Sequence, residues 1–176
     1  MKNTAIDLWG KTFSPAQDVR TPAEIIKTQC DLLEKATEGS VVAKIKSYVG
    51  TPSFDLLIKL DKPVGEGLGI QADLGNVTKE AFTFEFFITS TSTPNYKYRV
   101  MFLHYEIPCY PVHIVLDESI AKELEIIEDF ACNSQESFED ALSTILRSTR
   151  VENIINSLLA VALEGCAIDT YIQSGD

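Results

Sequence analysis

The chain contains no long apolar run, no signal-peptide core and no cysteine pattern of a disulfide framework or zinc site. None of its 176 residues belongs to an apolar run near the ~20 residues that a membrane-spanning helix needs. Asp7 and Lys11 interrupt the apolar core that a signal peptide would require at the N-terminus. The sequence therefore predicts a cytoplasmic protein without a membrane contact. Four scattered cysteines form no CxxC pair, which favours reduced thiols over a disulfide framework or a zinc site: Cys30, Cys109, Cys132 and Cys166.

Basic residues are also scarce. Lysine and arginine number 15 against 26 acids, so the net charge is −11. Because phosphate binding requires a basic surface, we expect no nucleic-acid partner. The acid is concentrated in residues 117–140, which hold nine carboxylates and one lysine. This segment is either a pair of solvated helix faces or a docking surface for a basic partner, whose encounter such a field accelerates.

Familiar catalytic motifs are absent. The sequence has no G-x-S-x-G and no H-E-x-x-H. The glycine-rich segment 62–78 contains Gly65-Glu66-Gly67-Leu68-Gly69 but lacks the Lys-Ser/Thr end of a phosphate loop. We interpret it as a plain loop or as a flap over a groove. No cofactor and no metal are expected.

A hairpin between residues 82 and 105 organises the predicted fold. Phe82, Phe84, Phe86 and Ile88 alternate with mostly polar residues, which predicts a strand with an aromatic stripe on one face. The turn residues 90–95 lead into a return strand over 96–105. We expect four apolar residues on the second face, which helices or another chain would have to cover: Phe87, Met101, Leu103 and Val115.

Capping signals and alternation predict the other elements. A helix over 22–37 follows the capping pair Thr21 and Glu24. Strands are expected over 41–49, 54–61 and 112–116. Three C-terminal helices are expected. The first begins at Asp117 and buries Ile127, the second has the capping pair Asn133 and Glu136, and the third has the pair Thr149 and Glu152 and ends near Gly165.

Together these patterns predict one α+β domain over residues 1–176. It has an N-terminal arm (1–20), an N-terminal helix, an antiparallel sheet of about five strands that is mostly a meander, three C-terminal helices packed on the sheet, and a polar tail (170–176). Length and composition are ordinary for one globular domain.

Two functional hypotheses follow. The first is a non-catalytic binding protein that engages a protein partner, of basic character or a second copy of the chain, through the acidic helices or the second sheet face. The second is a small enzyme or ligand-binding domain with a pocket under the glycine-rich loop, near His104, Glu106 and His113. Candidate partner-binding residues of the first hypothesis are Tyr96, Tyr98, Arg99, Met101, Leu103, Glu123, Glu125, Glu128 and Asp129.

Overall fold

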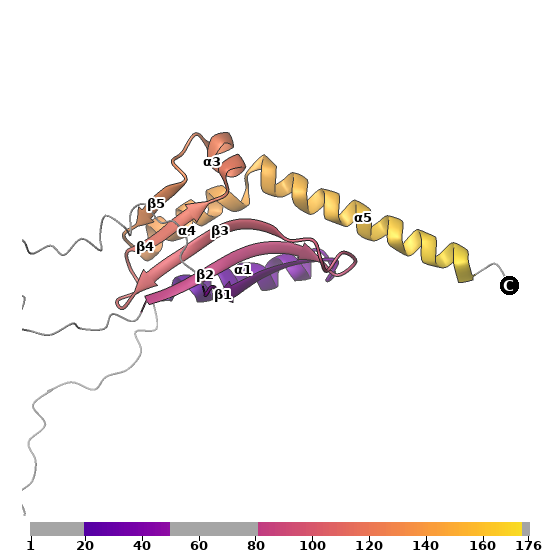
Figure 1. The fold of residues 1–176 in the computed structure, drawn as a ribbon, viewed down its shortest axis with the longest axis horizontal. Coiled ribbons are helices and arrows are strands. Elements are labelled where there is room, and N and C mark those ends of the chain that lie inside the picture. Colours follow the sequence, from indigo (N-terminus) through magenta and orange to yellow (C-terminus); the bar gives the residue numbers. More distant parts are fainter. Residues whose placement is uncertain (1–19, 50–80, 174–176) are drawn as a thin grey trace, which may run out of the picture.

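The computed structural model describes residues 20–49 and 81–173. Helix α1 (Pro22–Ala36) precedes a sheet whose strands each pair antiparallel with the next in sequence, and Figure 1 shows the whole arrangement. The sheet is therefore a meander, and the α+β class predicted from the sequence is confirmed. The strands are β1 (Val41–Ser47), β2 (Ala81–Ser90), β3 (Tyr98–Glu106), β4 (Val112–Leu116) and β5 (Asp129–Cys132); the later helices are α3 (Glu118–Leu124), α4 (Gln135–Leu146) and α5 (Thr149–Gln173).

The fifth strand of this sheet is not the one that alternation suggested. The expected strand 54–61 lies outside the described residues, and β5 occupies a segment expected to be helix or linker. Helix α3 ends at Leu124 because Glu125 takes a left-handed conformation, with φ 55°. That residue turns the chain, so Ile127 is not on a buried helical stripe as expected but is exposed.

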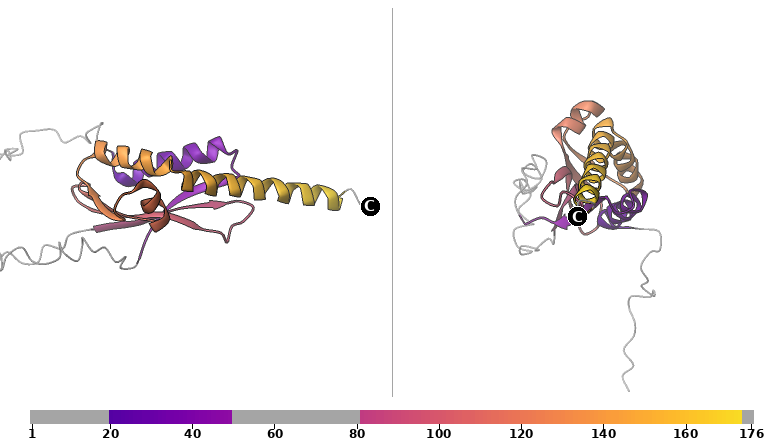
Figure 2. Two further views of the ribbon diagram at one scale, coloured as in Figure 1. Left: turned by 90° about the horizontal axis from the view of Figure 1, so that it is seen from above. Right: turned by 90° about the vertical axis from the view of Figure 1, so that its right-hand side faces the viewer.

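One face of the sheet carries the core. Helices α1, α4 and α5 all lie over this face, as the two views of Figure 2 show. Phe86 and Leu103 of the sheet and Phe138 of α4 are completely or almost completely buried there. The predicted aromatic stripe therefore faces the helices as expected, although Phe82, at its outer end, is 36% exposed.

Met101 and Leu103 also lie in this core, fully buried, and not on the second face where simple alternation placed them. The β2–β3 register shifts between Phe86 and Phe87. On one side of the shift Tyr98 pairs with Ile88, and on the other side Met101 pairs with Phe86. A bulge adds one residue to one strand, so it exchanges which residues face the core. Even-numbered residues of β3 face the helices before the shift and odd-numbered ones after it.

Several helix ends agree with the sequence patterns and others differ. The capping box of Thr21 and Glu24 is present at α1, and the side chain of Asp117 accepts a hydrogen bond from the Ser119 amide at α3. At α4 the capping box uses Ser134 and Ser137, one residue later than the expected Asn133 and Glu136. Asparagine and serine are both favoured N-cap residues, so the sequence alone does not show whether Asn133 or Ser134 caps the helix.

Helix α5 is the longest element and projects beyond the sheet (Figure 1). The hydroxyl of Ser148, and not that of Thr149, accepts from the first turn, at the Val151 amide. Gly165 does not end the helix, and residues 170–173 of the expected polar tail are helical. No helix within the described ranges combines the length and apolar character needed to cross a bilayer.

Candidate functional site

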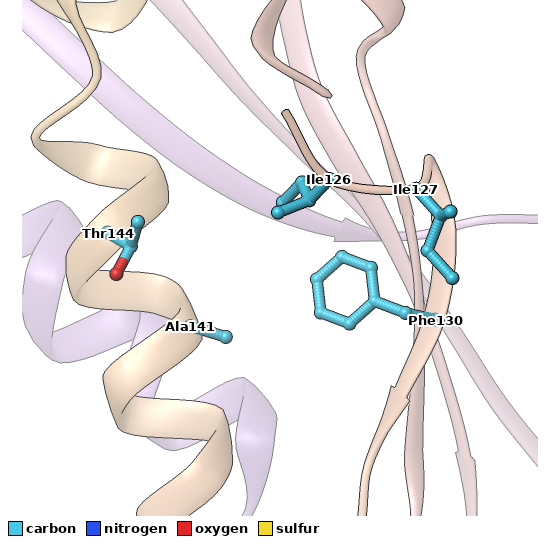
Figure 3. Close-up of a pocket in the computed structure, with 5 residues that line it drawn as sticks. All are labelled: Ile126, Ile127, Phe130, Ala141 and Thr144. Carbon is cyan, nitrogen blue, oxygen red and sulfur yellow. The ribbon is translucent and has the colours of Figure 1, made fainter. Parts of the chain in front are cut away.

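An open cavity of about 360 Å³ lies between the α3–β5 connection and helix α4. Figure 3 shows the Phe130 ring and the Ile126 side chain directed toward α4 across this space. Ile126 is 41% exposed and Ile127 is 71% exposed, which is unusual for two adjacent isoleucines. We call this site the apolar groove; the residues that line it are Ile126, Ile127, Phe130, Ala141 and Thr144.

Acidic residues are sequence neighbours of the residues that line the apolar groove. Glu125 and Glu128 flank its two isoleucines in sequence, and Asp140 precedes Ala141 on α4; all three are exposed. The single cation of residues 117–140, Lys122, forms an ion pair with Glu118 on the exposed side of α3. The groove is therefore apolar at its base and lies within a strongly negative part of the surface.

Of the acidic residues proposed for binding, Glu123 has a clear structural contact. Its carboxylate oxygens accept hydrogen bonds from the amides of Thr149 and Arg150, at 2.5 and 2.8 Å. These amides have no partner within α5, so Glu123 caps that helix from another element. Asp129 is half-buried at the start of β5, opposite Val115. Glu125 and Glu128 are thus the two proposed acids that lie beside the groove.

The two tyrosines proposed for binding differ in the same way: one makes structural contacts and the other is exposed. The Tyr98 hydroxyl donates to Asp117 Oδ1 at 2.9 Å, and the Arg150 guanidinium lies 5.6 Å from the centre of its ring. Burial and the neighbouring Asp117 raise the pKa of Tyr98. Tyr98 therefore joins the sheet to the helices, whereas Tyr96, at the end of the hairpin, is 39% exposed.

None of the described helices lies over the second face of the sheet (Figure 2), yet its aromatic rings are covered. The Lys97 ammonium lies 4.4 Å from the centre of the Phe87 ring, and the Arg99 guanidinium lies 4.6 Å from that of Phe102. Tyr48 packs on Phe102 with ring centres 4.7 Å apart. Long cationic side chains cover apolar surface with their stems while their charges stay in water. These cations therefore contribute to the burial of Phe87, over which no described helix lies.

Glu85 lies beneath these cations. Its carboxylate is buried and forms ion pairs with Lys97 and with Arg99, the latter with Nε 2.6 Å from Oε1. Burial alone would raise the pKa of Glu85, but the hydrogen bonds and charges of Lys97 and Arg99 outweigh it and hold that pKa below its ordinary value. Glu85 is therefore ionised and binds both cations.

Two further lysines lie on the same face. Lys44 and Lys46 of β1 are exposed and form no ion pair with any described residue. Lys46 also lies 5.7 Å from the Phe87 ring. We call Lys44, Lys46, Lys97 and Arg99 together the basic face; among the described residues, Glu85 is the carboxylate that forms ion pairs with it. Within the described residues, this cluster of excess positive charge lies on other elements than the acidic segment 117–140.

The two histidines do come together. His104 of β3 pairs directly with His113 of β4, and their ring centres are 6.5 Å apart. Thr83 Oγ1 lies 2.9 Å from Nδ1 of His104. His113 is buried, and its Nδ1 has no hydrogen-bond partner in the described parts of the chain. Burial lowers the pKa of His113, against the opposing charges of Asp129 and Glu106.

Glu106 is two residues from His104 on the same strand and thus on the same face. In residues 20–49 and 81–173, no group of three or more histidine, cysteine or acidic side chains is arranged to hold a metal ion. The glycine-rich segment 62–78, expected to lie over this site, is outside the described residues.

No protein-family model matches this chain, and no curated protein or solved structure matches it significantly. Its function must therefore be argued from the geometry above. Sequence reasoning missed the apolar groove, although one signal was present. Ile126 and Ile127 are two large apolar residues between the carboxylates of Glu125 and Glu128, and apolar residues clustered among exposed charged ones can mark an interaction site.

Proposed function

We propose that the protein is a non-catalytic binding protein that holds a basic segment of a partner protein at the apolar groove. The observation that supports this most is an exposed apolar cavity within the most acidic part of the surface. Apolar surface that stays exposed at a concave site, with polar residues at its rim, commonly marks an interaction site.

The two parts of this site contribute differently. An apolar side chain that becomes fully buried in the groove contributes about 1.5–3 kcal/mol. The carboxylates around the groove accelerate encounter with a cation-bearing partner and disfavour acidic ones. A partner segment with one large apolar side chain flanked by lysine or arginine fits both parts.

A labelled peptide provides the test. The probe is a short synthetic peptide with a central tryptophan between lysines, and its control has glutamates in place of the lysines. We expect the lysine peptide to bind, with weaker affinity at about 1 M than at about 0.01 M salt, because salt screens the carboxylates. Ile127→Asp should abolish binding. Leu163→Asp, at another exposed apolar residue, on α5, should leave it unchanged.

Affinity that is independent of salt, or equal binding of the two peptides, would contradict the acidic surface. Binding that survives Ile127→Asp would contradict the groove.

A second candidate function is a ligand-binding or acid–base site at the histidine pair. The observation that favours it is that His104 and His113 lie side by side on paired strands, near Glu106. Imidazole groups this close can act on one bound molecule. The test is a small-molecule screen that follows the imidazole resonances of the full chain by NMR. If no compound shifts both histidines, this candidate is rejected.

A further inference from the structure

The chain itself carries a segment of the kind that the apolar groove is proposed to accept. Tyr96 lies in the connection between β2 and β3, just after the turn, is 39% exposed and is followed directly by Lys97. Tyrosine is favoured as an interface anchor because it combines a large apolar ring with a polar end and has few rotatable bonds. The hairpin thus presents an aromatic anchor beside cations.

The hairpin holds this anchor in a defined position. The Tyr96 amide donates to the Thr93 carbonyl at 2.9 Å, and the Thr89 hydroxyl donates to the Tyr96 carbonyl at 2.7 Å. A side chain on a fixed backbone loses less entropy on binding than one on a free segment. The basic face, with Lys44, Lys46 and Arg99 as well as Lys97, continues from the hairpin along the open side of the sheet.

The groove and the hairpin lie at different places in the molecule. In Figure 1 the β2–β3 turn is at the end of the sheet away from α3 and β5, which border the groove. A molecule therefore presents its own anchor far from its own groove, and both remain available to other molecules.

We propose that a second copy of this chain is a partner of the apolar groove, with its Tyr96 ring between Ile126, Ile127 and Phe130 and its basic face toward Glu125 and Glu128. This rests on the proposed function of the groove. Charge complementarity carries it: the most acidic segment and the basic face are separate parts of one chain, and each is the complement of the other. Because the two contacting surfaces differ, the contact is head-to-tail, and it joins copies into rings or open chains.

Another exposed apolar surface competes for this role. Val161 and Leu163 on the projecting part of α5 are 44% and 73% exposed. Glu164 follows them, and α5 carries no cation after Arg150, so two such helices offer no opposite charges to each other. Association through α5 is therefore the outcome that the experiment must distinguish.

Sedimentation velocity of the full chain over a range of concentrations tests the proposal. We expect the wild-type chain to associate at about 0.01 M salt and to dissociate at about 1 M, because screening removes the charge attraction. Tyr96→Ala removes the aromatic anchor, and Ile127→Asp places a charge on the apolar surface of the groove. Each variant alone should therefore be monomeric. Mixed together they should form a 1:1 dimer and nothing larger, because each supplies the surface that the other lacks.

Two further variants keep the result interpretable. Lys44→Glu combined with Lys46→Glu reverses charge at exposed positions and should weaken association even if Tyr96→Ala disturbs the hairpin. Leu163→Asp is the matched control and should associate like the wild type.

A wild-type chain that stays monomeric at about 1 mM would overturn the proposal. So would association that Leu163→Asp abolishes, or a mixture of the two monomeric variants that forms no dimer. If the lysine peptide binds the groove while the chain remains monomeric, this inference fails and the proposed function stands. If neither occurs, both fail.

Discussion

The two faces of the sheet keep aromatic rings away from water by different means. On the covered face, Phe86 packs beneath helices and among other apolar side chains. On the second face, Phe87 and Phe102 lie beneath the side chains of Lys97 and Arg99, which form ion pairs with the buried Glu85. The first solution depends on close packing between elements, and the second depends on charges that remain in contact with water.

This difference has a functional consequence. A face covered by helices cannot bind anything else, whereas a face covered by its own cations can exchange them for contacts with a partner. Because the Glu85 carboxylate beneath these cations is buried, a partner must supply replacement cations for any that Glu85 loses. The second face and the acidic groove are thus the two surfaces on which binding can be sought.

The largest expected effect separates the two faces directly. Phe86→Ala should destabilise the protein by about 3–5 kcal/mol, because it leaves a cavity among side chains that cannot collapse into it. Phe102→Ala, half-buried beneath Arg99 and beside Tyr48, should cost less than half of that. Urea unfolding of both variants measures the difference. Equal losses would mean that the second face is packed as rigidly as the core.

Glu85 tests the electrostatic side of the comparison. Glu85→Gln should cost about 1.5–3 kcal/mol near neutral pH, because it removes the charged acceptor of two hydrogen bonds. The partners are about half exposed, which favours the lower end of that range. Urea unfolding at pH 7 provides the measurement.

The pH dependence of this effect has a definite sign. The folded pKa of Glu85 is below its ordinary value of 4.5, so its contribution is complete above pH 4.5 and is lost as the pH falls through the folded pKa. The difference between wild type and Glu85→Gln should therefore disappear in acid. A difference that persists in acid would show that packing, and not charge, is responsible.

The extent to which the sequence predicted this structure depends on how each feature is encoded. Features set by residues close in sequence were predicted correctly: the capping box of Thr21 and Glu24, the cap at Asp117, and the stripe of Phe84 and Phe86. Each of these depends on residues within a few positions of one another. The histidine pair was also foreseen, because adjacent antiparallel strands bring their facing residues together.

Features that depend on the register of distant segments were not predictable. Which face of the sheet Met101 and Leu103 occupy depends on the bulge opposite Phe86 and Phe87, and no residue in the sequence indicates that bulge. Strand β5 has only four residues, and it is a strand because its backbone pairs with the edge of β4. The groove requires that strand together with α4, so sequence reasoning identified its acidic neighbours Glu125 and Glu128 but not its base.

A smaller effect concerns which acids support the fold and which are free to bind. Glu123→Gln weakens a cap of α5 and should cost about 1 kcal/mol, within the range measured for helix caps. Glu128→Gln, the matched control beside the groove, should change stability by less than 0.5 kcal/mol, about the limit for surface substitutions. Conversely, only Glu128→Gln should weaken binding of the lysine peptide. The reverse assignment of the two effects would contradict our division of these residues.

The smallest expected effect concerns His113, which is buried on the second face of the sheet. Burial lowers its folded pKa below the ordinary 6.5, against the raising influence of Asp129 and Glu106. The unfolded chain then binds a proton more readily, so the stability from this group is complete above about pH 6.5 and decreases as the pH falls toward the folded pKa. Thermal unfolding between pH 5 and pH 8 should show this slope in the wild type, and His113→Asn should lack it. An unchanged slope in that variant would mean that other groups cause it, and that His113 takes up its proton on this face as easily as in water.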